Sequence, residues 1–516
     1  MQAVLRQCFC SAAFFKCRKT RQRMDKIMND FNLKPRLAKC ADFVIGSETV
    51  CDVGTDHALL AAELVTKRKI ARVIASDIAE GPLTAARATV ESLGLSEHIR
   101  LVQTDGLDGI EPEGISDVVI AGMGGESIIS ILERASWLGN GVNLILQPMT
   151  RAELLRVWLY ENGFRIELEE AVTEDRFIYT VIKARYYGKS IPLLDIAANT
   201  GMLDYSLPES RVYLSRRIEQ LRKKADGLAA SGDRTTSEKI NVLIDELMPL
   251  AKGRAFVLAS TVYRLLDALY PFSYQEKWDN SGFLVGNKSS VVSGILLTLD
   301  ITNEAVYEAD EKGCKLIVSH HPVIFEPLRR LSSDNPVYNL AACGISAICM
   351  HTNLDAAKGG MNDVVTELLS QRLDFDDNPE IFCKTPEVGV GIGKILRLRV
   401  PIHPSAMAEI LKELFGCEIV RFTDNGGYIE KIAVACGSCG SMLETALDAE
   451  CDALITGDVK HNIWVDAKNY AISLFDCGHF HTENIILEQL DEVLKANLPF
   501  IKTYIAKSSA DPVQYA

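Results

Sequence analysis

Two adjacent histidines stand out as residues that could bind metal ions. His320 and His321 follow the apolar run 316–318 and precede Pro322, so a buried strand is predicted to end at the pair. Neighbouring side chains of a strand point to opposite faces, but the backbone can turn where the strand ends. The two imidazoles can then each address one of two neighbouring metal ions.

Further His and carboxylate side chains stand four residues apart after other apolar runs. His479 and Glu483 follow a glycine, and their spacing places both on one face of a predicted helix. His351 and Asp355 have the same spacing and follow the apolar run 345–350. Imidazole with carboxylate suits zinc, iron, manganese or cobalt, and a carboxylate can bridge two such ions. A single histidine is more often an ordinary core or surface residue, but three clusters together predict a dinuclear metal site.

Length, charge and cysteine use restrict the class of protein. The 516 residues suggest about three units of ordinary size, and 47% hydrophobic with 24% charged residues is typical of a globular protein. A net charge of −14 argues against general coating of nucleic acid, so any RNA binding must be local. No run approaches the roughly 18 apolar residues of a membrane span, so we expect a cytoplasmic protein without membrane contact. Free thiols are the expected state of the 14 cysteines, and a redox role for the motif formed by Cys436 and Cys439 is the less favoured alternative.

A strand, a glycine turn and a helix of the nucleotide-binding kind are predicted in the first half of the chain. The apolar strand 50–53 ends at Gly54, and helix-forming residues follow. Residues 55–57 (Thr-Asp-His) stand where a dinucleotide site needs glycine, which disfavours NAD. S-adenosylmethionine (AdoMet) has no phosphates and tolerates such side chains. Asp52 or Asp56 can contact its amino-acid part.

Three further predicted strands end in residues that suit the rest of this cofactor. The strand 72–76 ends at Asp77, which can accept hydrogen bonds from ribose hydroxyls. The next strand is followed by Asp105 and Gly106, a contact for the adenine edge. The strand 117–120 runs into a glycine loop, where a methyl acceptor would approach. Each acid alone could equally cap a helix or close a turn, so the ordered series is what predicts a class I AdoMet methyltransferase with a parallel sheet.

Several of these segments resemble a known family. The segments similar to the bacterial tRNA (adenine-22-N1)-methyltransferase family are 52–58, 79–82, 105–107, 120–125 and 146–148. The resemblance covers about residues 33–250 and implies transfer of a methyl group from AdoMet to an adenine ring nitrogen in the D-arm region of tRNA.

The target nitrogen makes modest demands on the protein. Adenine N1 already has a lone pair, so attack on the methyl group needs positioning and desolvation more than a strong base. N1 is paired in a duplex, so the base must be unpaired or flipped out. We expect Asp56, His57, Gly122 and Gly124 to frame the target.

Two antiparallel helices are predicted after this domain. Leu214, Ile218 and Leu221 step by four and three, as in a coiled-coil seam, and residues 231–233 break the run. The basic residues of the first helix are Arg211, Arg216, Arg217, Arg222, Lys223 and Lys224. A charge run is usually a solvated face, but the family just named carries a coiled-coil arm, which favours a grip on tRNA.

The motifs of the second half resemble another family. Those similar to the hexameric dinuclear-metal family often labelled GTP cyclohydrolase type 2 homologues are 278–282, 319–322, 351–355 and 457–461, with Gly478, His479 and Glu483. The resemblance covers about residues 255–516 and implies a two-lobed α/β domain, two divalent ions and a hexameric ring. The ligands that it implies are His320, His321, Asp355, His479 and Glu483, with His351 close by. Segment 457–461 is expected to supply a side chain that contacts a metal ligand without binding the metal itself. His461 is not expected to be a ligand.

The predicted fold class is α/β: a Rossmann-like methyltransferase sheet with a helical coiled-coil arm, then a two-lobed dinuclear-metal domain. The predicted parts are a basic extension 1–24, a methyltransferase domain 25–190, a helical hairpin 191–252 and a metal domain 253–516. A translation start upstream of Met24 explains the basic extension at least as well as targeting does, so translation is expected to start at Met1 or Met24. We interpret the chain as bifunctional. Two alternatives stay open: a metal-dependent nucleotide hydrolase with an AdoMet-binding regulatory half, and a metal half that is only an oligomerisation scaffold.

Overall fold

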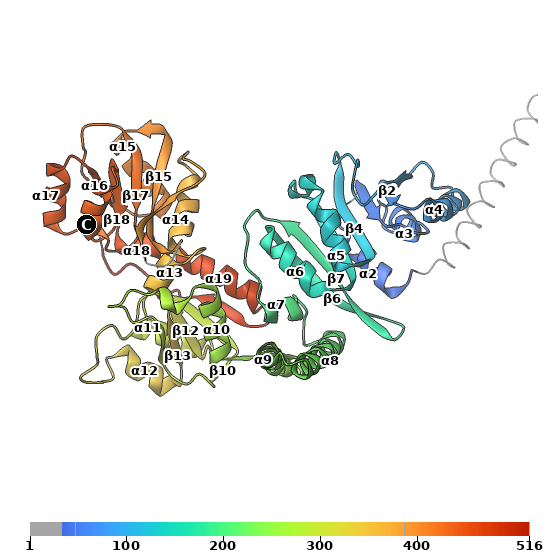
Figure 1. The fold of residues 1–516 in the computed structure, drawn as a ribbon, viewed down its shortest axis with the longest axis horizontal. Helices are drawn as coiled ribbons and strands as arrows, with labels where there is room; N and C mark the ends of the chain where they lie inside the picture. Colours follow the sequence, from blue (N-terminus) through green and yellow to red (C-terminus); the bar gives the residue numbers. More distant parts are fainter. Residues whose placement is uncertain (1–32, 47, 386–388, 515–516) are drawn as a thin grey trace, which may run out of the picture. The chain divides into compact units, whose positions relative to one another are not determined.

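The computed structural model describes residues 33–46, 48–385 and 389–514. The chain divides into two compact units, with the division between Arg254 and Ala255 (Figure 1). Both units combine sheets with helices, which confirms the predicted α/β class. The predicted bounds at 24, 190 and 252 stay predictions, and the first of them lies outside the described residues.

A seven-stranded sheet forms the centre of the N-terminal unit. Its strands are β1 (Thr49–Val53), β2 (Arg72–Asp77), β3 (Ile99–Gln103), β4 (Ile115–Gly124), β5 (Asn143–Thr150), β6 (Phe164–Glu174) and β7 (Phe177–Tyr186). Their order in the sheet is β3-β2-β1-β4-β5-β7-β6. The first five strands are parallel, whereas β7 runs antiparallel to both β5 and β6. β1, β2, β4 and β5 are mostly buried because helices cover the sheet, whereas the edge strand β3 is partly exposed.

Helices of this unit follow the strands and bury apolar faces on the sheet. They are α2 (Pro35–Phe43), α3 (Leu59–Thr66), α4 (Glu80–Leu93), α5 (Gly125–Glu133) and α6 (Ala152–Glu161). The first three share one apolar core with β1 and β2, which includes Phe43, Leu64 and Val90. Right-handed crossovers between parallel strands bring the loops after β1, β2, β3 and β4 to one edge of the sheet.

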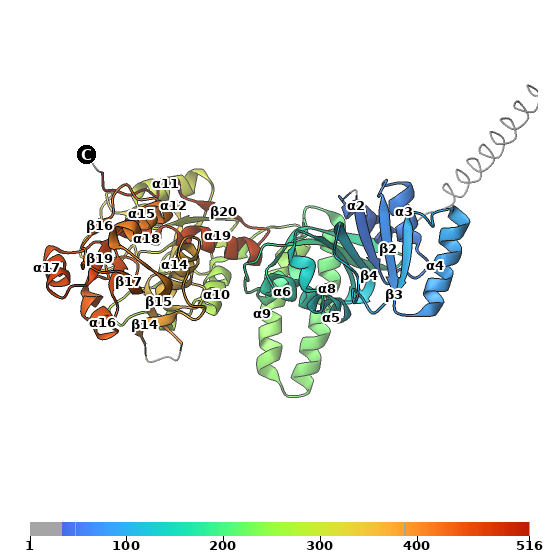
Figure 2. The same cartoon turned by 90° about the horizontal axis from the view of Figure 1, so that it is seen from above.

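A helical hairpin completes the N-terminal unit. After the short helix α7 (Asp195–Thr200), the helices α8 (Pro208–Ala230) and α9 (Arg234–Ala251) lie side by side (Figure 2). Leu214, Ile218 and Leu221 are buried in the seam between them, as the sequence predicts. Asp233 caps α9 by accepting a hydrogen bond from the Thr236 amide at 3.1 Å, so the hairpin turns where predicted.

A buried ion pair ties this hairpin to the sheet. Arg156 of α6 donates to Glu169 of β6 at 2.6 Å, and the two side chains are 1% and 0% exposed. Arg156 also donates to the hydroxyl oxygen of Tyr213 on α8 at 3.1 Å. Glu169 in addition accepts a hydrogen bond from the Met202 amide at 2.8 Å, so the pair holds the start of α8 against the sheet.

The C-terminal unit contains two larger sheets. The first is built from β9 (Gly282–Val285), β11 (Gly294–Thr298), β12 (Leu316–Ser319), β13 (Ser346–Cys349) and β20 (Lys502–Ile505), in the order β20-β11-β12-β13-β9. The second is built from β14 (Glu380–Lys384), β15 (Gly391–Ile402), β16 (Arg421–Phe422), β17 (Ile429–Val434), β18 (Ala453–Thr456) and β19 (Ser473–Asp476), in the order β14-β15-β17-β18-β19-β16. A small ladder pairs β8 (Val257–Leu258) with β10 (Val291–Val292).

Helices cover both sheets of this unit. They are α10 (Ala259–Leu269), α11 (Asn303–Glu311), α12 (Pro336–Cys343), α13 (Thr352–Ala356), α14 (Met361–Ser370), α15 (Pro404–Phe415), α16 (Leu443–Asp448), α17 (His461–Asn469), α18 (His479–Glu483) and α19 (Ile486–Asn497). Loops after β11, β12 and β13 of the first sheet and after β18 and β19 of the second carry His or acidic side chains.

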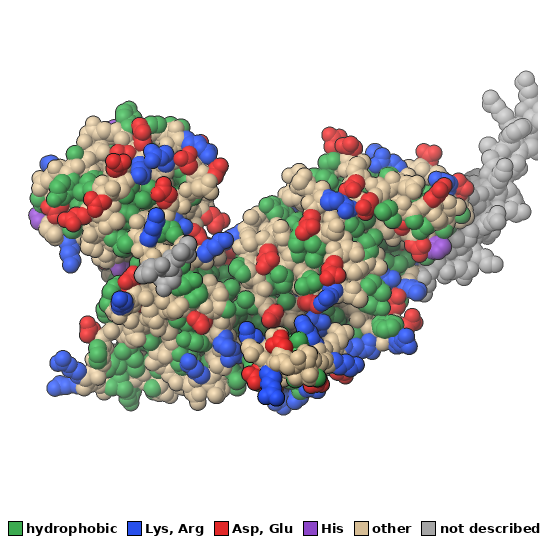
Figure 3. All heavy atoms as spheres, viewed as in Figure 1, with side chains coloured by type: hydrophobic (Ala, Val, Ile, Leu, Met, Phe, Trp, Pro, Cys, Tyr) green, Lys and Arg blue, Asp and Glu red, His purple; other side chains and the backbone are tan. Residues whose placement is uncertain are grey.

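Acidic and basic side chains are interspersed over the viewed face (Figure 3). Within the described part of the chain, no helix combines the length and the apolar character that crossing a bilayer requires.

Candidate functional sites

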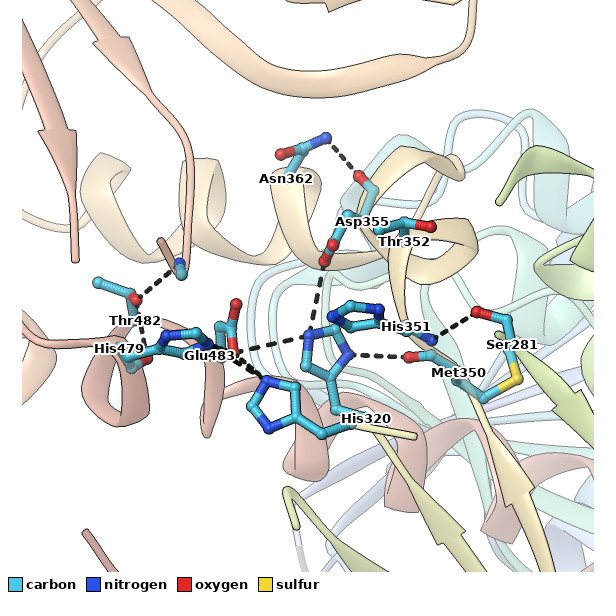
Figure 4. Close-up of polar contacts among 12 residues, drawn as sticks. Ser281, His320, Met350, His351, Thr352, Asp355, Asn362, His479, Thr482 and Glu483 are labelled. Carbon is cyan, nitrogen blue, oxygen red and sulfur yellow. Dashed lines mark hydrogen bonds and ion pairs between the residues drawn. The ribbon is translucent and has the colours of Figure 1, made fainter. Parts of the chain in front are cut away.

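Three imidazoles of the C-terminal unit converge on one carboxylate (Figure 4). His320 and His321 directly follow β12, whereas His479 and Glu483 are the first and last residues of α18. Glu483 Oε2 lies 2.9 Å from His321 Nε2, 3.0 Å from His479 Nε2 and 3.6 Å from His320 Nε2. The glycine before α18 has φ +82, which lets the chain turn sharply from β19 into this helix.

Asp355 and His351 extend the cluster on its other side. Asp355 lies on α13, and its Oδ1 is 3.8 Å from His320 Nε2. The His351 ring centroid is 5.3 Å from that of His320. The structure therefore brings together all five residues predicted as ligands, with His351 beside them as expected. Their role as metal ligands stays a prediction.

Each imidazole is held from behind through its other ring nitrogen. The Nδ1 contacts are His320 to the Met350 carbonyl at 2.8 Å, His321 to Asp300 at 2.8 Å, His351 to Asp279 at 2.7 Å and His479 to Asp458 at 2.9 Å. An acceptor at Nδ1 keeps the proton there and leaves the Nε2 lone pair directed into the cluster. This arrangement is typical of histidines that ligate a metal ion.

Buried carboxylates change the pKa values of the imidazoles beside them. Burial opposes protonation of His321, but its hydrogen bonds to Asp300 and Glu483 raise its pKa to about 10. Burial likewise opposes protonation of His479, and the bonds to Glu483 raise its pKa to about 9. Burial raises the pKa of Asp355 to about 6, although the nearby His320 acts in the opposite direction and lowers it. Positive charge on the imidazoles thus offsets carboxylates that are buried away from water.

Two buried atoms of the cluster lack any hydrogen-bond partner among the described residues. They are Nε2 of His320, which is fully buried, and Oδ1 of Asp355. Buried polar atoms nearly always have a hydrogen-bond partner. Two lone pairs without one, both directed into the same space, therefore indicate a cation-binding site. Imidazole nitrogens and carboxylate oxygens are a donor set that suits borderline divalent ions. The residues present therefore fit the expected dinuclear metal group.

A cavity of about 490 Å³ opens beside His321 and His479. Asp300 and Asp458, the two acids behind these histidines, also line it. Its further lining includes Arg421, whose side chain is 61% exposed and is paired with Asp476. A small polar molecule thus has space next to the cluster, with one guanidinium within the same cavity.

Some residues of this site were not assigned by sequence. The sequence predicts no role for Asp300 and gives Asp279 only as part of the motif 278–282, although these acids hold His321 and His351. Segment 457–461 was expected to support a ligand, and Asp458 does contact His479. His461 is exposed at the start of α17. The cysteines within the described ranges are free thiols.

The N-terminal unit has a cavity of about 510 Å³ at the carboxyl ends of its parallel strands. Four of the five predicted cofactor contacts line it: Gly54, Asp77, Asp105 and Gly106. The fifth, Asp52, is 3% exposed and accepts a hydrogen bond from the Thr55 hydroxyl at 2.7 Å. Burial raises the pKa of Asp52 to about 6. The structure thus places Asp52 behind the Gly54 turn, outside the lining of the cavity.

Glycine is required at two positions of this cavity. Gly54 has φ +77, and a Cβ there would lie 2.4 Å from Met123 Cε. Gly106 has φ +63, and a Cβ there would lie 2.8 Å from the Ile131 side chain. Both conformations disfavour other residues, and both leave bare backbone facing the cavity. An adenosine-type cofactor fits such a cradle, because it can approach the backbone between the acids at the strand ends.

The residues predicted to frame the methyl acceptor lie in two places. Asp56 and His57 are exposed, with 3.7 Å between Asp56 Oδ1 and His57 Nε2, and neither lines the cavity. The Gly122 amide donates to Gln147 Oε1 at 3.1 Å, and Arg36 Nη1 donates to the same oxygen at 2.7 Å. Gln147 belongs to the segment 146–148 that resembles the methyltransferase family, and Arg36 lies within the range of that resemblance, but the sequence predicts no task for either. The framing role stays a prediction.

Comparisons with known proteins divide the chain in the same way. Residues 257–512 match the profile of the Duf34/NIF3 (NGG1p interacting factor 3) family, and residues 33–182 match a methyltransferase-domain profile. A GTP cyclohydrolase 1 type 2 homolog of Campylobacter jejuni is 33% identical over 262 residues, which cover 50% of this chain and 98% of that protein. A tRNA (adenine(22)-N(1))-methyltransferase of Bacillus subtilis is 35% identical over 177 residues, which cover 34% of this chain and 74% of that protein. A solved structure of the Staphylococcus aureus hypothetical protein SA1388 is 26% identical, with 50% of this chain and 99% of that chain covered and a TM-score of 0.46.

Proposed function

Since this chain belongs to the tRNA (adenine(22)-N(1))-methyltransferase family through its N-terminal unit and to the Duf34/NIF3 family through its C-terminal unit, we propose that it is bifunctional. The N-terminal unit methylates N1 of an adenine at the position-22 site of tRNA, with AdoMet as the donor. The observation that carries this proposal is the cavity lined by Gly54, Asp77 and Asp105, where a phosphate-free nucleoside cofactor fits.

The residues around this cavity have distinct tasks. AdoMet, when bound, supplies an electrophilic methyl group on a sulfonium. Asp77 accepts hydrogen bonds from ribose hydroxyls, Asp105 contacts the adenine edge, and Gly54 lets the backbone approach. Asp52 acts from behind the Gly54 turn, where its bond to Thr55 fixes the loop.

Positioning accounts for the acceptor side of the reaction. Adenine N1 needs no deprotonation, so Asp56 and His57 orient and desolvate the flipped base. Gln147 holds the Gly122 amide, and Arg36 holds the Gln147 side chain, so the loop with Gly122 and Gly124 keeps its shape.

Methylation of tRNA transcripts by the full-length protein tests this proposal. We expect 1-methyladenosine in nuclease digests by mass spectrometry, and a reverse-transcription stop at the target nucleotide, because N1 methylation blocks the Watson–Crick edge. A transcript with guanine in place of the target adenine should give no product, and Asp77→Ala should weaken AdoMet binding measured by calorimetry. AdoMet-saturated protein that leaves the target adenine unmodified contradicts the proposal.

For the C-terminal unit we propose two divalent ions held by His320, His321, Asp355, His479 and Glu483, drawn from zinc, iron, manganese or cobalt. Such a pair, when bound, lowers the pKa of a bound water and supports hydrolysis of an ester, amide or ring bond. Asp300 and Asp458 keep His321 and His479 oriented. The fully buried and unpaired Nε2 of His320 is the observation that supports this proposal.

A substrate panel separates a hydrolase from a scaffold. Metal-loaded protein is assayed against GTP, other nucleotides and phosphodiesters, beside a His320→Ala variant. Turnover that the variant lacks supports a hydrolase acting in the cavity beside His321. No turnover from fully loaded protein, together with a hexameric mass by light scattering, supports a metal-dependent ring that presents the methyltransferase to tRNA.

A further inference from the structure

A second cavity of the N-terminal unit has no task in the function proposed above. It measures about 580 Å³ and is lined by the end of β5, the start of β7 and one face of α8. Arginines and aromatic residues make up much of its lining: Arg151, Arg216, Arg217, Phe177, Tyr179 and Tyr213. Cationic and aromatic side chains together are the chemistry that contacts unpaired nucleotides.

One arginine of this cavity is available to an anionic ligand. Arg217 is paired with Glu153 at 3.0 Å, and Arg151 lies 3.7 Å from the same carboxylate. Arg216 is exposed, and its side chain makes no hydrogen bond or ion pair with the described residues. Among the described residues of the lining, Glu153 is the one acid against three arginines, so the cavity carries net positive charge.

An exposed aromatic ring lies in the same cavity. Phe177 is 47% exposed at the start of β7, although a phenylalanine normally buries its ring. The Tyr179 ring is 6.2 Å away, and the Arg176 guanidinium lies 5.0 Å from the Phe177 centroid. A base that stacks on Phe177 would therefore gain an aromatic surface with a cation beside it.

The position of the cavity relates it to the methyl-transfer site. β4 and β5 are paired so that Gly124 lies opposite Thr150, a residue of the second cavity's lining. Arg151 of that lining is 4.0 Å from Glu126, which lines the cofactor cavity. The two cavities thus adjoin across the loop that is expected to frame the target base.

We propose that this second cavity binds an unpaired nucleotide that flanks the target adenine, with its base on Phe177 and its phosphate at Arg216. The inference rests on the proposed RNA methylation and adds the place where the neighbouring nucleotide is held. Holding a flanking nucleotide stabilises the RNA in the conformation in which the target is unstacked.

Steady-state methylation kinetics on full-length protein test the inference. Phe177→Ala should raise KM for the tRNA transcript about tenfold with kcat within about twofold, because a stacking contact is lost while the chemistry is untouched. Phe177→Trp should restore KM. Arg216→Ala should also raise KM. It should reduce the slope of log affinity against log salt by about 1, as expected for the loss of one phosphate contact.

Matched variants control for general effects. Tyr187 is 61% exposed and Arg87 is exposed, and neither lines the cavity, so Tyr187→Ala and Arg87→Ala should leave KM unchanged. AdoMet affinity and the thermal transition are measured for each protein, and they should equal those of the wild type. If Phe177→Ala is unstable, the exposed Arg216 site and its salt slope still decide the question.

The outcomes distinguish this inference from the function on which it rests. Wild-type protein that methylates the target adenine, with KM and salt slope unchanged in both variants, overturns the nucleotide site and leaves the methyltransferase intact. If the wild type makes no 1-methyladenosine, the proposed function fails, and fluorescence anisotropy with the same transcripts still compares RNA affinity among the variants. Equal RNA affinity in that assay overturns the inference as well.

Discussion

The Nε2 atoms of His321 and His479 lie 3.2 Å apart, although each histidine already has a carboxylate at its Nδ1. Two imidazole lone pairs at this distance repel each other unless a proton or a metal ion lies between them. The same space is bounded by the Glu483 carboxylate, so the geometry suits a shared cation.

Metal content is therefore the first prediction. We expect wild-type protein to hold about two divalent ions per chain by mass spectrometry, and His479→Ala to hold fewer. Chelation should lower the thermal transition of the wild type and change that of His479→Ala much less, because only the native site binds the metal. His461→Ala, an exposed histidine of the same unit, is the control and should match the wild type. Equal metal content in all three proteins would contradict the site.

Substitution of Asp458 tests whether its contact with His479 strengthens metal binding. Asp458→Asn keeps the size of the side chain but removes the charge that holds the proton on Nδ1 of His479. Metal affinity, measured by competition with a chelating dye, should fall about 10- to 100-fold. Asp448→Asn, at an exposed position of α16, should leave affinity unchanged. An Asp458→Asn protein with wild-type affinity would mean that this contact does not support a ligand.

The buried pair of Arg156 and Glu169 predicts a large stability effect. Arg156→Leu leaves the Glu169 carboxylate, which is 0% exposed, without its cation, so the N-terminal unit should lose about 3–5 kcal/mol. Calorimetric unfolding of the full chain measures this as a lower first transition. Arg68→Ala breaks the exposed pair with Asp42 and should cost less than about 1 kcal/mol. Similar losses of unfolding free energy in both variants would show that the buried pair stabilises the unit no more than an exposed pair does.

Asp52 predicts a pH dependence of stability. Its pKa is raised from an ordinary value of 3.8 to about 6, so folding favours the protonated carboxyl. The stabilisation is complete below about pH 3.8 and is lost as pH rises through about 6, because ionisation in the buried site is costly. Asp52→Asn should therefore match the wild type near pH 4 and exceed it by about 3 kcal/mol near pH 7, in unfolding without AdoMet. If Asp52→Asn is no more stable than the wild type at pH 7, burial does not raise the pKa of Asp52.

Asp56 tests how the acceptor is framed. Asp56→Ala should lower kcat for tRNA methylation, with AdoMet affinity unchanged, because Asp56 does not line the cofactor cavity. Asp108→Ala, an exposed acid of the same edge of the sheet, is the control. Methylation at the full rate by Asp56→Ala would remove this residue from the site.

The sequence predicts the first four strands of the N-terminal unit better than its last three. β1 and β2 are short apolar runs that end at Gly54 and Asp77, and both are where the pattern predicts them. β6 instead alternates irregularly, because a register shift between Ile166 and Leu168 moves its side chains to other faces. Glu169 is buried there opposite its arginine partner, a pairing that no local pattern reveals.

The metal cluster shows a similar limit. Residues four apart on one helix, such as His479 and Glu483, are visible from spacing alone. The carboxylate behind His351 comes from Asp279, which is 72 residues away, and that distance carries no periodic signal. The acid behind His351 is therefore recognised only when the fold brings the two loops together.

His321 and His479 are also separated by 158 residues of chain, and this separation has a consequence during synthesis. When residues up to 356 have left the ribosome, the nascent polypeptide carries His320, His321 and Asp355, whereas His479 and Glu483 are still to be made. A polypeptide that ends before residue 479 would therefore lack part of the metal site proposed above.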